Sequence, residues 1–134
     1  EGSPQDLYDT MSRYRSQAAK TFSNNNVIAG YRRSPVEYAA DWGLDDLERP
    51  WSTLSGGEAQ RAMLAITLAL QPDVMILDEC TNALDYDTTL KVEATLKALR
   101  IPILMVSHSM EQVDRFCNHQ INIGSAGSVA EVSI

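Results

Sequence analysis

Three short stretches of the chain carry residues whose types and spacing could do chemistry. They are the helix start Ser55-Gly56-Gly57-Glu58, the acidic pair Asp78-Glu79, and His108. A bare helix start binds phosphate, because its first N–H groups are free. A carboxylate at Asp78 suits Mg²⁺, usually through water, and Glu79 beside it can polarise an attacking water. His108 can contact a terminal phosphate or hold that water, so the three stretches together predict chemistry on a phosphate-bearing ligand.

The helix start has two unusual features. Ser55 and Glu58 stand three residues apart, the spacing of a capping box in which the serine caps the helix and the glutamate reaches back. Gly56 and Gly57 fill the first turn, although glycine costs roughly 1 kcal/mol per residue against alanine in a helix. Two glycines in a row predict that another group comes close to the backbone, most naturally a phosphate. The alternative is an ordinary N-cap with a flexible entry.

The acidic pair and the histidine both follow apolar runs. Asp78-Glu79 comes directly after Val74–Leu77, and His108 comes shortly after Ile103–Val106. Apolar runs without alternation are typical of parallel strands covered on both faces. Open α/β sheets bind ligands at the carboxyl ends of such strands. The alternative for the acidic pair is that both carboxylates are simply solvated, and the alternative for His108 is a structural role.

The elements that must position these groups follow from the pattern around them. The helix that Ser55 opens is expected to run to about Leu70, with apolar residues on most of its faces. Further helices are expected from about Asp87 to Arg100 and from about Met110 to Phe116, with a strand near Gln120 to Ile123. The order strand, helix, strand, helix, strand favours a parallel sheet.

The first 53 residues are expected to form a segment of helices and loops. Ser3-Pro4 reads as a helix opening. One face of that helix carries a stripe expected to be a packing surface: Leu7, Met11, Tyr14 and Ala18. A polar loop follows at Ser23–Asn26. A second capping box, Ser34-Pro35-Val36-Glu37, opens a short helix that Gly43 is expected to end.

Composition limits the function classes. The chain has 134 residues and a net charge of −7, from 11 basic and 18 acidic residues. It is therefore one domain at most, and its acidity argues against binding nucleic acid or an anionic membrane through general electrostatics. Cys80 and Cys117 form no disulfide or metal pattern, which favours a reducing, cytosolic setting. The longest apolar run, Ala62–Leu70, is too short to cross a bilayer.

The motifs, in this order, resemble those of ATP-binding cassette (ABC) ATPases. Leu54–Arg61 (LSGGEAQR) resembles the family's signature motif, and Val74–Glu79 resembles its Walker B strand, with Glu79 in the place of the catalytic glutamate. Ala83-Leu84-Asp85 resembles the D-loop, and His108 the switch histidine. The resemblance extends from about residue 34 to residue 123. It implies a P-loop NTPase fold in which two such domains sandwich two ATP molecules.

The resemblance also implies a role for each residue. Asp78 would hold Mg²⁺ through water, Glu79 would act on the attacking water, and His108 would sense the γ-phosphate. The signature would contact, in trans, the ATP held by the opposite domain, through Ser55, Gly56, Gly57, Glu58 and Gln60. The implied partners are a second ABC ATPase domain, in a homo- or heterodimer, and transmembrane permease subunits. No nucleic-acid partner is expected, and the implied location is the cytoplasmic face of a membrane.

The chain departs from the family pattern in three places. Cys80 stands where proline is common, and Asn82 stands where serine is usual. No glycine precedes any of the three lysines (Lys20, Lys91 and Lys97), so the Gly-Lys-Ser/Thr phosphate loop, or Walker A motif, is absent from the sequence. The family also has a glutamine in its Q-loop. Gln5 and Gln17 are both candidates for it, and Asn24–Asn26 lie near the position that the Q-loop has in the family.

We therefore expect an α/β fold of the P-loop NTPase (ABC ATPase) type as a partial domain. Residues 1–53 form the amino-terminal segment, and residues 54–134 carry the signature helix, Walker B, D-loop and switch histidine. The expected function is ATP binding and hydrolysis in an ABC transporter, with this chain a fragment without the phosphate loop and inactive by itself; whether that loop lies upstream of Glu1 stays open. The alternatives are a non-transport ABC ATPase, acting in DNA repair or translation, and a catalytically silent remnant. The transported solute, its direction and the permease stay open.

Overall fold

The computed structural model describes residues 2–21, 33–123 and 129–133 of the chain. Its first half is helical and contains α1 (Pro4–Thr21), α2 (Pro35–Asp41), the short 3-10 helix η1 (Trp51–Thr53) and α3 (Gly56–Ala69). Its second half alternates strands and helices in the order β1 (Met75–Asp78), α4 (Tyr86–Ala98), β2 (Ile103–Val106), α5 (Met110–Phe116), β3 (His119–Ile123) and β4 (Val129–Ser133). This is the α/β composition that the sequence predicts, although the division after residue 53 stays a prediction.

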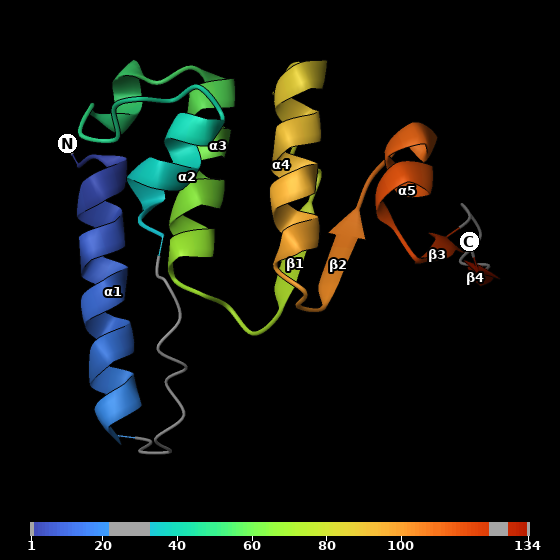
Figure 1. The fold of residues 1–134 in the computed structure, drawn as a ribbon, viewed down its shortest axis with the longest axis horizontal. Helices are drawn as coiled ribbons and strands as arrows, with labels where there is room; N and C mark the ends of the chain where they lie inside the picture. Colours follow the sequence, from blue (N-terminus) through green and yellow to red (C-terminus); the bar gives the residue numbers. More distant parts are fainter. Residues whose placement is uncertain (1, 22–32, 124–128, 134) are drawn as a thin grey trace.

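The strands β1 and β2 pair in parallel, as predicted. The register runs from Met75 opposite Ile103 to Asp78 opposite Val106. Helix α4 joins the two strands and lies against one face of the pair (Figure 1). The ends of both strands therefore meet at one edge, which is where the predicted Mg²⁺ ligand lies.

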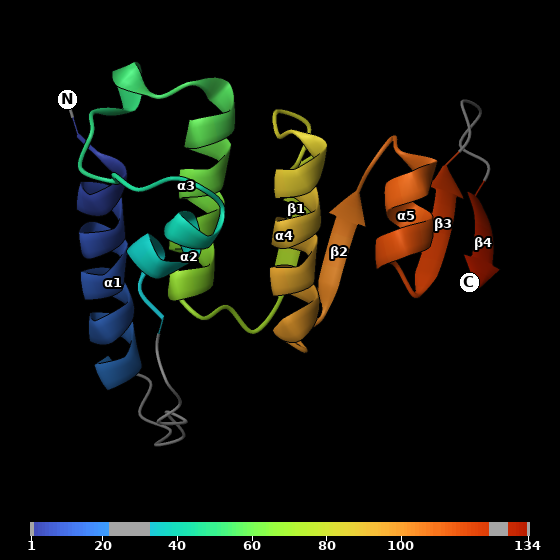
Figure 2. The ribbon, with the colours of Figure 1, turned by 45° about the horizontal axis from the view of Figure 1, so that its top comes forward.

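The third strand does not continue this sheet, so that part of the prediction is wrong. β3 pairs antiparallel with β4 in a separate two-stranded sheet, from His119 opposite Ser133 to Ile123 opposite Val129. Figure 2 shows this second sheet beyond α5, away from β1. Each residue of β3 stands opposite a residue of β4 in this second sheet.

The core lies between α2, α3, β1 and α4. Trp42, Leu68 and Leu96 are among its largest fully buried side chains. Helix α3 buries most of its apolar residues, as the sequence predicts. Gly43, with φ of 75°, ends α2 after a complete capping box between Ser34 and Glu37, so that prediction is also confirmed.

Only one face of the β1–β2 sheet is covered by the described residues. Met75 and Leu77 are buried, whereas Ile76 is 74% exposed, and Leu104 and Val106 are also exposed. The prediction that these strands are covered on both faces is therefore wrong for the described part of the chain. Successive strand residues point to opposite faces, and no described helix packs on the second one.

The expected packing stripe on α1 is also mostly exposed. Leu7 is half-buried, but Met11 and Tyr14 lie in solvent. The reason is that α1 is attached near its amino-terminal end: the Gln5 N–H donates to the Leu47 carbonyl at 3.0 Å, and the Trp51 N–H donates to the Gly2 carbonyl at 3.2 Å. Later turns of the helix extend past the core (Figure 1).

Candidate functional site

The acidic pair lies at the end of β1. Asp78 is its last residue and is exposed. Glu79 follows with φ of 44°, a left-handed backbone that costs a non-glycine residue about 1–3 kcal/mol. The Glu79 N–H donates to the Val106 carbonyl at 3.0 Å, which extends the pairing of the two strands by one residue. The two carboxylates are thus held beside the end of β2.

Glu79 and His108 meet at this edge. The His108 Nε2 lies 2.7 Å from the Glu79 Oε1, although the histidine side chain is 89% exposed. The Asn82 side-chain amide donates to the other carboxylate oxygen of Glu79. From the sequence, Asn82 was notable only because it stands where the family usually has serine. The structure makes it a partner of the predicted catalytic carboxylate. An exposed pair contributes only about 0–1 kcal/mol, so Glu79 and His108 cannot hold each other in place alone.

Cys80 is a buried residue in the position where the family commonly has proline. Burial raises the pKa of its thiol, which is therefore protonated at neutral pH and unreactive. Its small side chain belongs to the buried core cluster, which also contains Leu77. Cys80 thus acts as a packing residue at the base of the loop.

The start of α3 forms the predicted capping box. The Glu58 N–H donates to the Ser55 Oγ at 3.2 Å, and the Ser55 N–H donates to the Glu58 Oε2 at 2.8 Å. Arg49 donates to the Glu58 Oε1 at 2.8 Å. The hydrogen bond from the Ser55 backbone, with that from Arg49, lowers the pKa of Glu58 to about 2. The Glu58 carboxylate is thus engaged within the chain.

The two glycines have different surroundings. A Cβ on Gly57 would lie 2.7 Å from the Ala83 carbonyl oxygen, so the close approach at Gly57 is made by the chain's own D-loop. A Cβ on Gly56 would have no described atom within 4 Å. Gly56 is therefore the position open to an external ligand, and its N–H, as the first of the helix, has no intrahelical partner.

Gln60 also contacts the D-loop. Its Nε2 donates to the Glu79 carbonyl at 3.2 Å, and its Oε1 accepts from the Ala83 N–H at 3.1 Å. Both ends of the amide that was predicted to bind ATP are thus engaged with the loop after β1. Asp85 caps α4 by accepting from the Thr88 N–H at 2.9 Å. The signature helix, the acidic pair and the D-loop (Ala83, Leu84 and Asp85) form one bonded unit.

The residues at this edge suit a hard cation. Asp78 offers an exposed carboxylate, and Mg²⁺ binds through one or two carboxylates while keeping much of its water. The described residues contain no cluster of three or more His, Cys, Asp or Glu side chains, as a transition-metal site would need.

Of the Q-loop candidates, Gln5 bonds Asp9 on α1, which lies on the far side of α3 from the sheet (Figure 2). Asn24–Asn26 lie outside the described residues.

The site combines a capped helix start, an acidic pair at the end of β1 and a histidine shortly after β2, in an α/β fold. The sequence profile of the ABC transporter family matches residues 7–82, more than half of the chain. The chain therefore belongs to the ABC transporter family. This confirms the resemblance to an ABC ATPase nucleotide-binding domain.

Individual relatives agree with this assignment. The chain is 40% identical over 102 residues to the phosphate import ATP-binding protein PstB of Mycoplasma genitalium, covering 73% of this chain and 31% of PstB. It is 41% identical over 100 residues to the methionine import ATP-binding protein MetN of Pasteurella multocida, covering 67% of this chain and 29% of MetN. The chain thus spans about a third of the length of these relatives.

A solved structure has the same fold. It is described as an ABC transporter of the metal-chelate type in an inward-facing conformation, and it matches with a TM-score of 0.61 at 20% identity. The match covers 87% of this chain and 49% of that one. This confirms the partial P-loop NTPase fold. Within the described residues, none of the helices combines the length and apolar character that crossing a membrane requires.

Proposed function

We propose that this chain supplies the signature, Walker B, D-loop and switch part of the ATP-hydrolysing subunit of an ABC transporter. The observation that carries the proposal is the 2.7 Å contact between Glu79 and His108 at the ends of two adjacent parallel strands, beside Asp78. Membership of the ABC transporter family supports it, as do two relatives whose names describe import ATP-binding proteins.

Each residue of the site then has a task. Asp78 would hold Mg²⁺, which would supply positive charge against the phosphates. Glu79 orients the attacking water and accepts its proton. His108 is exposed enough to reach the terminal phosphate while its Nε2 contacts Glu79. Asn82 holds the second carboxylate oxygen of Glu79, which limits the rotation of that side chain.

The proposed partners are a second ABC ATPase domain and transmembrane permease subunits, at the cytoplasmic face of a membrane. The second domain would present its nucleotide to the start of α3. The open space at Gly56 and the free N–H groups of a helix start support this orientation. Ser55, whose Oγ caps the helix, lies beside that space. The two relatives are named for different solutes, phosphate and methionine, and the residues of this site would contact only nucleotide.

The phosphate loop is the part that this sequence lacks. No Gly-Lys-Ser or Gly-Lys-Thr occurs in the 134 residues, which supports a catalytically silent state for the chain by itself. Reading the coding sequence upstream of Glu1 for a Gly-Lys-Ser or Gly-Lys-Thr loop is the first test.

The second test is the ATPase activity of the protein that carries both parts. Glu79→Gln keeps the side chain's shape but removes its charge, so turnover should fall by about 10²–10⁴ while MgATP still binds. Glu48→Gln, at an exposed glutamate far along the chain from the strand ends, is the matched control and should leave turnover unchanged. Full activity in the Glu79→Gln variant would remove Glu79 from the catalytic role.

A further inference from the structure

A buried amide connects the two segments that carry Glu79 and His108. Gln112, on α5, is 6% exposed. Its Nε2 donates to the Thr81 Oγ1 at 2.9 Å and to the Glu93 Oε1 at 3.0 Å. Its Oε1 accepts from the Ser107 Oγ at 2.7 Å. The side chain therefore bonds the loop after β1, helix α4 and the segment after β2 at the same time.

These partners stand next to the reacting residues. Thr81 lies two residues after Glu79, and Ser107 directly precedes His108. On the other side of His108, the Ser109 Oγ accepts from the Gln112 backbone N–H at 3.2 Å, and the Ser109 N–H donates to the Ser107 Oγ at 3.1 Å. His108 is thus flanked on both sides by residues that are bonded to Gln112.

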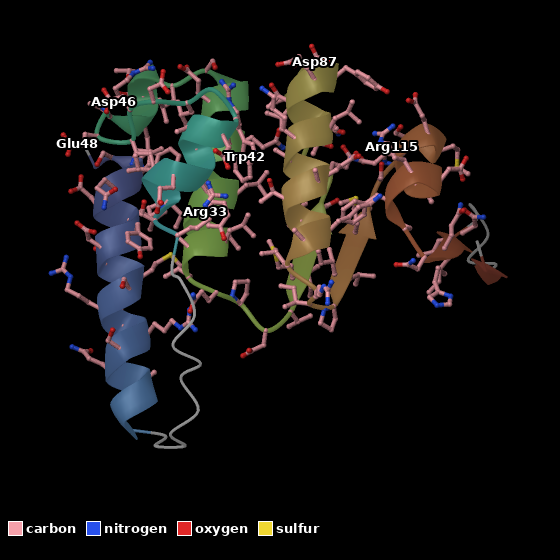
Figure 3. The ribbon with its side chains drawn as sticks, viewed as in Figure 1. Arg33, Trp42, Asp46, Glu48, Asp87 and Arg115 are labelled. Carbon is pink, nitrogen blue, oxygen red and sulfur yellow. The ribbon has the colours of Figure 1, made fainter. Side chains whose placement is uncertain are left out.

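The orientation of the Gln112 amide is fixed by the buried carboxylate of Glu93, which also pairs with Arg115. Glu93, on α4, is 3% exposed and accepts from the Arg115 Nε at 2.7 Å and from its Nη2 at 2.8 Å. Arg115 extends from α5 toward α4 (Figure 3). Burial raises the pKa of Glu93, but the hydrogen bonds from Arg115 and Gln112 outweigh it and lower the pKa. Because an ionised carboxylate only accepts, the NH₂ of Gln112 must face Glu93, and its oxygen must face Ser107.

We infer that Gln112 is a positioning residue, which holds the two segments so that Glu79 and His108 meet. The contact between these two is exposed and contributes little by itself, and Glu79 has a strained backbone. Other contacts must therefore fix the geometry. The side-chain hydrogen bonds of Gln112 reach both the segment that carries Glu79 and the segment that carries His108. The effect on turnover rests on the proposed function, whereas the effect on the geometry does not.

The geometry can be tested by nuclear magnetic resonance on this chain. Gln112→Met keeps the length of the side chain and removes all of its hydrogen bonds. The nuclear Overhauser contact between the His108 ring and the Glu79 side chain should disappear. Exchange of the Glu79 N–H, which donates to Val106, should become up to about ten-fold faster. The matched control is Gln5→Met, which loses one exposed bond to Asp9 on α1 and should change neither signal.

A second variant covers the case in which Gln112→Met does not fold. Thr81→Val keeps the shape of Thr81 and removes only its bond to Gln112. It should weaken the same Overhauser contact and speed up the same exchange. A folded Gln112→Met or Thr81→Val variant that keeps both signals at parent values would overturn the inference.

Activity gives a further readout in a protein that carries the phosphate loop. A positioning role predicts that Gln112→Met lowers kcat by about 10²-fold while KM for ATP stays unchanged, because nucleotide is held elsewhere. An unchanged kcat, in a protein where Glu79→Gln lowers turnover by about 10²–10⁴ as expected, would also overturn the inference. If Glu79→Gln has no effect, the proposed function fails, and the resonance experiment still decides whether Gln112 sets the geometry.

Discussion

Gly57 faces the carbonyl oxygen of Ala83 so closely that a Cβ on the glycine would lie 2.7 Å from that oxygen. The signature helix and the D-loop are therefore in direct contact through a position that only glycine fills without a shift. Gln60, one turn further along α3, bonds the same loop. The start of the signature helix thus has two surfaces, one closed by its own D-loop and one open at Gly56.

The two glycines should respond differently to alanine. Gly57→Ala places a methyl group against the Ala83 carbonyl, and such overpacking typically costs about 1–3 kcal/mol. Gly56→Ala meets open space and should be neutral, or stabilise the helix by up to about 1 kcal/mol. Urea unfolding of the two variants measures the difference. Equal midpoints would show that the D-loop does not pack against Gly57 in solution.

Acid should weaken the cap of α3. The pKa of Glu58 is about 2 in the folded chain against an ordinary value of 4.5. Its contribution to stability is therefore complete above about pH 4.5 and is lost as the pH falls toward 2. Glu58→Gln keeps a side chain suited to the capping box but does not titrate. The urea midpoint of the parent should approach that of this variant between pH 5 and 2. A constant gap between them would contradict the lowered pKa.

The exposed face of the β1–β2 sheet should tolerate polar change. Ile76→Thr keeps a β-branched side chain at an exposed position and should change the free energy of unfolding by less than about 0.5 kcal/mol. Leu96→Ala, in the core, should cost about 2–5 kcal/mol. Ile76→Thr should also reduce the binding of a hydrophobic dye, because the apolar face is in solvent. A large cost for Ile76→Thr would mean that this face is covered in solution.

The chain alone should not bind MgATP. Most of the binding free energy for nucleotide comes from the phosphate loop, whose N–H groups and lysine surround the phosphates. The sequence has no such loop. In the proposed function, Asp78, Glu79 and His108 act on a nucleotide that another part of the site holds. Calorimetry at micromolar to low-millimolar MgATP should show no saturable heat, and hydrolysis should stay at background. Stoichiometric binding would mean that the chain contains a phosphate site of another kind.

The sequence determined the features that depend on neighbours a few residues apart. The capping boxes at Ser55–Glu58 and Ser34–Glu37 form as predicted, because a cap is closed by residues three positions apart. The place of Asp78 at a strand end could likewise be predicted, because the apolar run and the charge that ends it are adjacent in the chain. The motif order was enough to identify the family.

Only the tertiary structure decided which groups meet across long stretches of sequence. The hydrogen-bonding capacity of Gln60 and Gln112 could be read from the residue type. The Glu79 partner of Gln60, and the Thr81 and Glu93 partners of Gln112, lie 19 or more residues away on other elements. The pairing of β3 with β4 and the exposure of Ile76 also depend on how elements distant in the sequence pack together. An apolar pattern predicts that a face can be buried, whereas the elements that pack nearby decide whether it is.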